Sequence, residues 1–218
     1  MIASALKLSI VVSLLATLLV AVAATIAARL LTRRSFRGRA LLDAALNLPL
    51  VLPPTVTGYY LIVLLGRRGL LGGPLFETTG WSITFTWAAC VLAAAVMAFP
   101  LMYRAARVAF EELDPRHEIA AASLGHAPLS VFLRVSLPLA RRGLTAGVTL
   151  AFARSLGEFG ATLMLAGNIM GRTQTLPLAL YEAVVSGEDG DAAVLVVLLT
   201  LVSFAVMLAA GRLGRRLR

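Results

Sequence analysis

Charged residues are scarce in this chain of 218 residues. Asp, Glu, Lys and Arg make up 14% of it, against about 25% in soluble proteins, and 59% of the residues are hydrophobic. A chain of this length could bury a sizeable core in water, but this one has too little charge to cover its outside as well. The composition excludes an ordinary soluble domain.

Side chains that hold metals or carry out nucleophilic chemistry are also scarce. Cys90 is the only cysteine, so no disulfide can form within the chain, and His117 and His126 share no ligand spacing with it. The sequence has no G-x-x-x-x-G-K-[ST] loop, no H-E-x-x-H motif and no Ser, His and Asp in a catalytic arrangement. We therefore expect no metal, no cofactor and no catalytic residue.

Acidic residues are outnumbered by basic ones, 11 to 20, which gives a net charge of +9. The basic residues gather in short segments beside apolar runs, and they form no face interleaved with aromatic residues. This distribution is typical of membrane topology and argues against a nucleic-acid partner.

The sequence does contain apolar runs, five of which can cross the roughly 30 Å hydrocarbon layer of a bilayer as helices. The first run is longer than the apolar stretch of a signal peptide, about 7–15 residues, and is interpreted as a retained span. The runs predict an all-α, polytopic membrane protein with residues 1–218 in a single transmembrane domain. The expected spans are residues 8–31, 46–65, 81–103, 143–166 and 192–213.

Two segments interrupt this pattern. Pro49, Pro53 and Pro54 remove backbone hydrogen bonds from the second run, which predicts a kinked or broken helix. Residues 176–185 are apolar but too short to cross a bilayer unaided. We interpret them as an interfacial or re-entrant helix, and a sixth crossing is the alternative.

The arginines orient the expected spans. They concentrate after the first, third and fifth runs, whereas the alternate segments hold few basic residues and an acidic cluster at residues 188–191. Short basic segments remain in the cytoplasm, so five spans place the N-terminus outside and the C-terminus in the cytoplasm. The residues that orient the chain are Arg33, Arg34, Arg37, Arg39, Arg104, Arg107, Arg116, Arg134, Arg141, Arg142, Arg212, Arg215, Arg216 and Arg218.

One expected span carries charge. Arg154 and Glu158 are four residues apart and therefore share a helical face. Because a charge at the bilayer centre costs about 2.5–3.5 kcal/mol, both must be paired or face a cavity. They either neutralise each other as a structural pair or line and gate a translocation path. Pro53, Pro54 and Thr55 likewise either expose backbone groups to such a path or form a simple kink.

The longest polar interval, residues 114–138, carries the strongest signal. Asp114 followed by Pro115 is typical of a helix start, and Gly125 is typical of a helix end. A second amphipathic segment follows, and Pro138 introduces the fourth run. Two alanines precede the glycine, and a V-x-L tripeptide precedes this proline, 13 residues after the glycine.

This interval resembles the E-A-A-x-x-x-G-x9-I-x-L-P signature of the permease subunits of binding-protein-dependent ABC importers. The resemblance implies a cytoplasmic coupling helix that docks in a groove of an ATPase subunit. The chain departs from the signature at Ile119, which replaces the glutamate; the acid lies one residue earlier, at Glu118. The residues assigned to ATPase coupling by this resemblance are Glu118, Ile119, Ala120, Ala121, Leu124, Gly125, Leu137 and Pro138.

Four further segments are similar to the molybdate permease subfamily, and the similarity runs from about residue 40 to residue 182. These segments are residues 47–55 (NLPLVLPPT), 66–69 (GRRG), 94–101 (AAVMAFPL) and 150–161 (LAFARSLGEFGA).

The resemblance implies a type I importer permease fold and alternating access in a homodimer, so the chain itself is not an enzyme. The implied partners are two ABC ATPase subunits and an extracytoplasmic oxyanion-binding protein, in a bacterial or archaeal cytoplasmic (inner) membrane. The first alternative is a permease for sulfate, tungstate or another oxyanion. A non-transporting membrane scaffold and a channel belong to other classes. A scaffold needs neither the coupling spacing nor charges within a span, and a channel would show leak without nucleotide.

Overall fold

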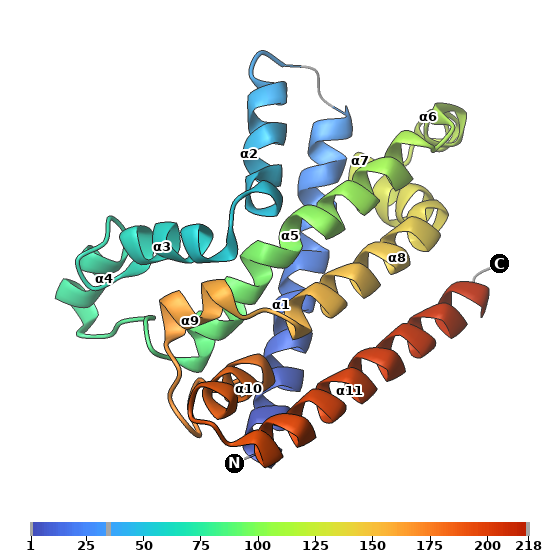
Figure 1. The fold of residues 1–218 in the computed structure, drawn as a ribbon. Helices are drawn as coiled ribbons and strands as arrows, with labels where there is room; N and C mark the ends of the chain where they lie inside the picture. Colours follow the sequence, from blue (N-terminus) through green and yellow to red (C-terminus); the bar gives the residue numbers. More distant parts are fainter. Residues whose placement is uncertain (1, 34–35, 217–218) are drawn as a thin grey trace.

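The computed structural model describes residues 2–33 and 36–216, and the regular elements in these residues are all helices (Figure 1). This confirms the predicted all-α fold class. The elements are α1 (Ile2–Arg33), α2 (Arg39–Val51), α3 (Pro54–Leu65), α4 (Gly72–Thr79), α5 (Trp87–Glu111), α6 (Pro115–Ser123), α7 (Pro128–Val131), the π-helical turn η1 (Phe132–Ser136), α8 (Leu137–Leu156), α9 (Gly160–Ala166), α10 (Leu176–Val185) and α11 (Asp189–Arg216).

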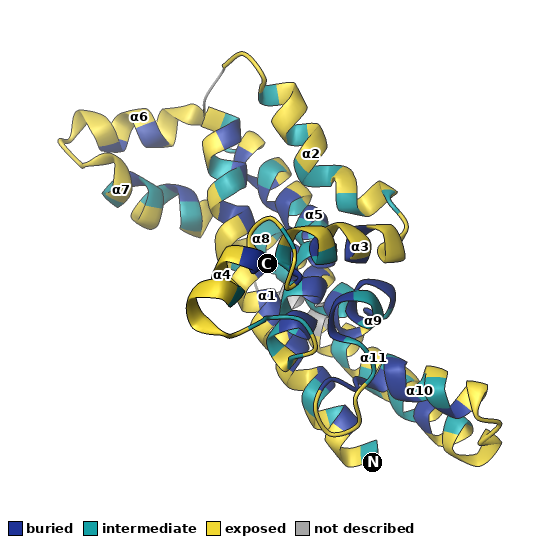
Figure 2. Cartoon of the chain, turned by 90° about the vertical axis from the view of Figure 1, so that its left-hand side faces the viewer, coloured by how far each residue is buried: buried dark blue, intermediate teal, exposed yellow. Residues whose placement is uncertain are grey.

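The core lies where α1, α5 and α8 pack against one another, and the buried residues gather there (Figure 2). Small side chains line these contacts. A Cβ atom on Gly147 of α8 would lie 2.7 Å from the Sδ of Met102 and 2.9 Å from the Cβ of Ala105, both on α5. Small residues therefore set the distance between these helices, as is common in membrane bundles.

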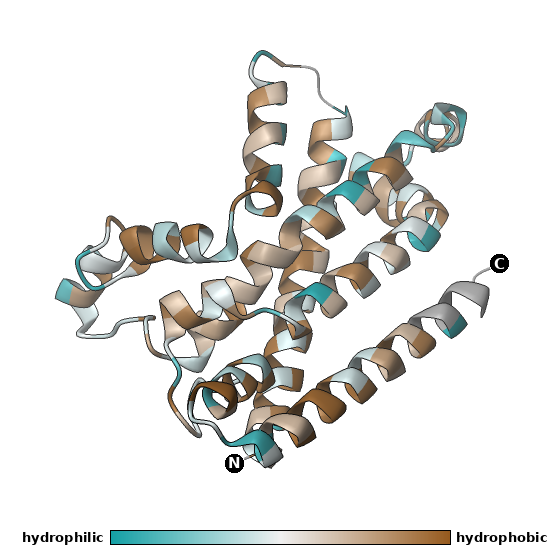
Figure 3. Cartoon of the chain, in the orientation of Figure 1, coloured by the Kyte–Doolittle hydropathy of each residue, from teal (hydrophilic) through white to brown (hydrophobic). Residues whose placement is uncertain are grey.

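The long apolar helices fit a membrane. Within the described residues three helices are long and apolar enough to cross one: α1, α5 and α11 as far as Ala209. The pair α2 and α3 would be a fourth if its bent halves count as one span. Only 6% of the apolar window of α11 is buried, and Figure 3 shows that most of its length is hydrophobic. Lipid or another chain must cover this helix.

The second expected span is broken at its prolines. The axes of α2 and α3 differ by 118°, and Figure 1 shows the chain turning sharply between the two helices. α3 begins at Pro54, where the missing N–H costs nothing because the first N–H groups of a helix have no intrahelical partner.

The third expected span begins later than residue 81. Residues 80–86 are outside any helix, and α5 starts at Trp87 because Thr86 caps it, accepting a hydrogen bond from the N–H of Ala89 at 3.3 Å. The helix then continues beyond the expected end at residue 103, as far as Glu111.

The fourth expected span, residues 143–166, is two helices instead of one. α8 ends at Leu156 and α9 begins at Gly160. The carboxylate of Glu158 accepts a hydrogen bond from the N–H of Ala161 at 2.9 Å and so caps the second helix. The apolar residues continue across this break, which is why hydropathy alone predicts an unbroken span.

The segment at residues 176–185 is the short helix α10. It packs against α1 and α11, and the hydroxyl of Ser9 on α1 accepts a hydrogen bond from the N–H of Leu176 at 2.7 Å. Figure 1 shows α10, the N-terminus and the start of α11 at one end of the molecule, with α6 and α7 far from it.

Candidate functional site

The connection between α5 and α8 contains the short helix α6, and both of its ends are fixed by local chemistry. Asp114 accepts a hydrogen bond from the N–H of Arg116 at 2.9 Å, which caps the start. At the other end Gly125 has a φ of +83°, and its N–H bonds to the carbonyl of Ala122 at 3.0 Å. The N–H of His126 bonds to the carbonyl of Ala121 at 3.3 Å, which completes a Schellman motif.

This connection carries uncovered apolar side chains. Ile119 is 63% exposed and Leu124 is 80% exposed, and Leu129 on α7 is exposed as well. Ala120 and Gly125 are exposed beside them, whereas Ala121 is buried, Leu137 is half-buried and Pro138 is exposed at the start of α8. Exposed apolar groups on a polar connection are typical of a surface for another protein.

Glu118 points the other way. It is 8% exposed, and its carboxylate forms ion pairs with Arg29, at 2.7 Å, and with Arg33, both on α1. It also accepts a hydrogen bond from the hydroxyl of Ser136. The sequence resemblance grouped Glu118 with Ile119 for ATPase coupling. In the structure Glu118 is buried against α1, whereas its neighbour Ile119 is 63% exposed.

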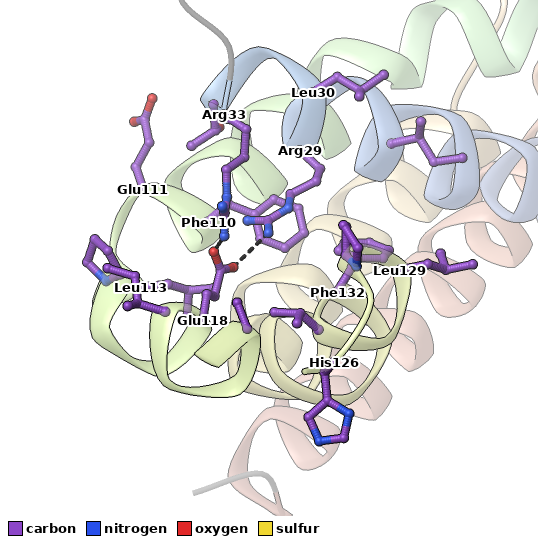
Figure 4. A pocket seen from close by; sticks show the side chains of 17 residues that line it. Arg29, Leu30, Arg33, Phe110, Glu111, Leu113, Glu118, His126, Leu129 and Phe132 are labelled. Atoms are coloured by element: carbon purple, nitrogen blue, oxygen red, sulfur yellow. Dashed lines mark ion pairs between the residues drawn. The ribbon is translucent and has the colours of Figure 1, made fainter. Parts of the chain in front are cut away.

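An aromatic pair completes this cluster. The guanidinium of Arg29 lies 5.5 Å from the ring centre of Phe110 on α5 and 5.6 Å from that of Phe132 on η1, close enough for cation–π attraction. Figure 4 shows the carboxylate of Glu118 facing the two arginines, with Phe110 behind them. We name the set the α6 anchor; it comprises Arg29, Arg33, Phe110, Glu118, Phe132 and Ser136.

Four members of the α6 anchor were not predicted from the sequence. These four residues, Arg29, Phe110, Phe132 and Ser136, were assigned no role. Glu118 and Ala121 are three residues apart and share one face of α6, and both are buried.

A cavity of about 940 Å³ adjoins the α6 anchor, between the ends of α1 and α5 and the segment from α6 to α7. Its wall is mostly apolar, with charged groups of the anchor on one side (Figure 4). Residues from its different walls include Ile26, Leu30, Leu113, Ile119, His126 and Leu129.

The charged pair predicted within the fourth span lies at the helix break. Arg154 and Glu158 form an ion pair at 2.6 Å; Glu158 is only 3% exposed, whereas Arg154 is partly exposed. The pair is therefore structural in the sense that it neutralises a buried carboxylate. The carboxylate also caps α9, so the pair fixes the break between α8 and α9.

Buried hydroxyl groups surround this carboxylate. Ser155, Thr162 and Thr175 line a narrow space with Glu158, together with serines of α1. The hydroxyls of Ser155 and Thr175 are buried and have no hydrogen-bond partner among the residues that the structure describes. Buried polar groups normally have hydrogen-bond partners, so excluding water from this seam, the row of hydroxyls around Glu158, costs free energy.

The two helix breaks meet. A Cβ atom on Gly160 would lie 2.9 Å from the Cβ of Pro54 and 3.4 Å from the backbone nitrogen of Thr55. The structure thus brings Pro54 and Thr55 next to the start of α9, close in sequence to Glu158. It keeps this region apart from the connection that holds α6, with the 20 residues of α8, about 30 Å of helix, between them.

Known proteins resemble this chain over most of its length. Residues 20–218 match the family described as binding-protein-dependent transport system inner membrane component. The chain is 47% identical over 182 residues to the molybdenum transport system permease protein of Escherichia coli (strain K12), a match that covers 83% of this chain and 80% of that protein. It is 37% identical over 191 residues to the sulfate transport system permease protein of Salmonella typhimurium (strain LT2), covering 86% and 69%.

A solved structure has the same fold. A chain of the inward facing MetNI methionine ABC transporter superposes with a TM-score of 0.76 and covers 98% of this chain and 94% of its own. The two are 17% identical, so this likeness concerns the fold alone. That fold is the one predicted from the sequence, an ABC importer permease.

Proposed function

The chain belongs to the family of binding-protein-dependent transport system inner membrane components, and from this premise we propose that it is the permease of an ATP-driven molybdate importer. The observation that supports molybdate as the substrate is the sequence identity to a molybdenum permease along most of the chain. The sulfate permease is less similar, which makes sulfate the second candidate, and tungstate, as a similar tetrahedral dianion, remains a candidate for the same path.

In this proposal two copies of the chain form the translocation path, two ABC ATPase subunits bind on the cytoplasmic side, and an oxyanion-binding protein delivers the substrate from outside. The permease supplies the path and its partners hydrolyse ATP. The N-terminus and the turn between α10 and α11 face outward, and α6 and the C-terminus face the cytoplasm. The arginines that follow the first, third and fifth expected spans, residues 8–31, 81–103 and 192–213, support this orientation through the positive-inside rule.

The exposed side of α6 is the surface we assign to the ATPase, and α6 is hereafter called the coupling helix. Ile119 and Leu124 would enter a groove of the partner, and the alanines and Gly125 would allow close approach. Leu137 and Pro138 begin the stiff helix α8, which leads from the coupling helix to the break at Gly157. Movement of the ATPase would reach the path through this helix.

The two helix breaks are where we place the path. Arg154 is partly exposed and lends a positive charge to a passing oxyanion, while Glu158 keeps the net charge of the pair near zero so that the anion can leave. The seam of hydroxyls without partners supports an alternative state in which water reaches them. Pro53, Pro54 and Thr55 form the opposite wall. Alternating access would open this region first to one side and then to the other.

The experiment is the ATPase activity of the purified complex in liposomes, with the binding protein loaded with molybdate, tungstate or sulfate. Stimulation by molybdate and tungstate but not by sulfate is expected. Stimulation by sulfate alone would keep the mechanism and change the substrate. An intact complex that no oxyanion stimulates would contradict the importer and favour a scaffold, and substrate leakage without nucleotide would favour a channel.

A further inference from the structure

The coupling helix is separated from the end of α1 by the cavity described above, and a charged link crosses between them. Glu118 reaches from α6 to Arg29 and Arg33 on α1. In the same cluster Ser136 connects Glu118 to η1, and Arg29 also donates a hydrogen bond to Ser136 at 3.2 Å. Figure 4 shows this link at the edge of the open space.

Four elements meet at the α6 anchor. α1 contributes the arginines, α6 the carboxylate, α5 the ring of Phe110, and η1 both Phe132 and Ser136. The π-helical turn matters here because Phe132 and Ser136, at its two ends, both contact Arg29. π-helical turns are rare and occur frequently at functional sites.

The chemistry of the α6 anchor makes the link specific. A buried carboxylate is costly unless it is paired, and here two guanidinium groups and a hydroxyl pair it. Replacing the carboxylate by an amide would leave two arginines facing each other near a cavity, without their counter-charge. The link would then break at α6, since the aromatic rings hold Arg29 from the other side.

We propose that Glu118 is a positioning residue that fastens the coupling helix to α1, so that α1 moves together with α6 when the ATPase moves. The inference rests on the proposed function for the direction of the movement, but the attachment itself is a property of this chain. Glu118 acts from the buried face of the helix, and the ATPase is contacted through exposed side chains such as Ile119 and Leu124. α1 is then a second route, beside α8, by which the coupling helix moves the bundle.

The first test measures the attachment in the complete permease, without any ATPase. Spin labels are placed at Leu30→Cys on α1 and His117→Cys on α6, both exposed, in a Cys90→Ala background. We expect one narrow distance distribution in the parent and a broad one after Glu118→Gln. Glu112→Gln, an exposed acid outside the anchor, is the matched control and should leave the distribution narrow. A narrow distribution in Glu118→Gln overturns the proposal.

A double variant that exchanges the two charges distinguishes loss of the ion pair from misfolding of the variant. Glu118→Arg combined with Arg33→Glu keeps the net charge of the anchor and restores an opposite pair between α6 and α1. We expect this double variant to narrow the distribution again, whereas Glu118→Arg alone leaves it broad. A double variant as broad as the single one would show that charge pairing does not make the attachment, and the proposal would fail.

The second test uses the whole complex and compares substrate transported per ATP hydrolysed. In Glu118→Gln this ratio should fall by about tenfold while the ATPase still co-purifies with the permease. Loss of the ATPase from the complex, with the label distance still narrow, would mean that Glu118 is a docking contact. An unchanged ratio would overturn the coupling role. If the parent complex shows no ATP-driven uptake, the proposed function fails, while the label distances still decide whether Glu118 makes the attachment.

Discussion

Gly125 ends the coupling helix in a backbone conformation that L residues rarely adopt. Its φ is +83°, and a Cβ atom there would meet nothing within 4 Å. Any side chain at this position therefore costs backbone strain, about 1–2 kcal/mol, and in addition projects from the surface that we assign to the ATPase. The two effects can be separated, because Gly38 before α2 has a φ of +94° and is equally open.

We expect Gly125→Asp to reduce ATP-driven uptake by about tenfold or more, because it brings a charge onto an apolar docking surface. Gly38→Asp carries the same type of backbone strain away from that surface and should keep most of the uptake. Uptake into proteoliposomes and the amount of permease in the membrane are measured for both. Normal uptake by Gly125→Asp, or an equal loss in both variants, would remove the docking role from this end of α6.

Glu158 and Arg154 form an ion pair beside a helix break, and a structural role for this pair can be separated from the proposed gate. Arg154→Ala leaves a buried carboxylate without its counter-charge, which costs about 3–5 kcal/mol. We expect a clear loss of thermal stability in detergent for this variant. Arg154→Ala combined with Glu158→Gln should recover much of it, because the amide oxygen can still accept the hydrogen bond that caps α9.

The same double variant tests the gate. If the pair lines the path, the recovered protein should remain folded and transport more slowly, and its ATPase should respond less to loaded binding protein. Full transport by the stable double variant would leave the pair with a structural role only.

At the scale of the residue, the sequence indicated candidate side chains but not the direction in which they point. Glu118 was identified from its place in a signature, but its inward orientation depends on the end of α1, which is 85 residues earlier in the chain if counted from Arg33. Contacts over such a separation leave no trace in local periodicity. Arg154 and Glu158, in contrast, lie four residues apart, and local spacing was enough to pair them.

At the scale of the element, glycines decide how closely helices approach. A Cβ atom on Gly58 of α3 would lie 2.7 Å from the Cβ of Met164 and 2.9 Å from the Cα of Ala161, both on α9. The second neighbour is backbone and cannot rotate away. Gly190, in the first turn of α11, has nothing within 4 Å of such an atom. The two glycines are therefore a matched pair for testing close packing.

Alanine is favoured over glycine within a helix by up to about 1 kcal/mol. We therefore expect Gly190→Ala to keep or raise the thermal midpoint of the permease in detergent. Gly58→Ala gains the same helix propensity but forces α3 away from α9. Such overpacking costs about 1–3 kcal/mol, so the thermal midpoint of this variant should fall. Equal shifts in the two variants would mean that α3 and α9 are not in close contact.

Helix ends were the least predictable part of the fold. Proline interrupts a helix and is visible in the sequence, so the bend between α2 and α3 was expected. The break between α8 and α9 was not expected. The carboxylate of Glu158 caps α9, but four residues from Arg154 it is also typical of an ion pair on a continuous helix. The start of α5 had a signal that was overlooked: Thr86 is a good capping residue, but the aromatic Trp81 made the apolar run look longer.

At the scale of the whole molecule, the surface shows what the chain requires from its surroundings. α11 and one face of α1 expose large apolar side chains such as Leu14, Leu18 and Leu201. This exposed apolar surface is suited to contact with lipid and with the second copy of the proposed homodimer. The hydropathy of the sequence predicted such a surface. The number of crossings is harder to predict. α8 contains three arginines and is not among the helices that are long and apolar enough to cross a membrane.

The side of the membrane on which each end lies can be tested with single cysteines, because Cys90 is buried and should stay unlabelled. Ser186→Cys lies in the turn between α10 and α11, and Ser123→Cys lies at the end of α6; both positions are exposed. With five crossings and basic segments inside, we expect an impermeant maleimide to label Ser186→Cys in intact cells, and Ser123→Cys only after permeabilisation.

Each departure from that result has a distinct meaning. If both positions require permeabilisation, α10 crosses the membrane as the sixth span, and the C-terminus then lies outside. If Ser123→Cys is labelled in intact cells, the coupling helix faces away from the compartment that holds ATP. No ATPase could then reach Ile119 and Leu124, and the proposed coupling would fail whatever the substrate. The labelling pattern therefore tests orientation, the role of α10 and the premise of coupling in one measurement.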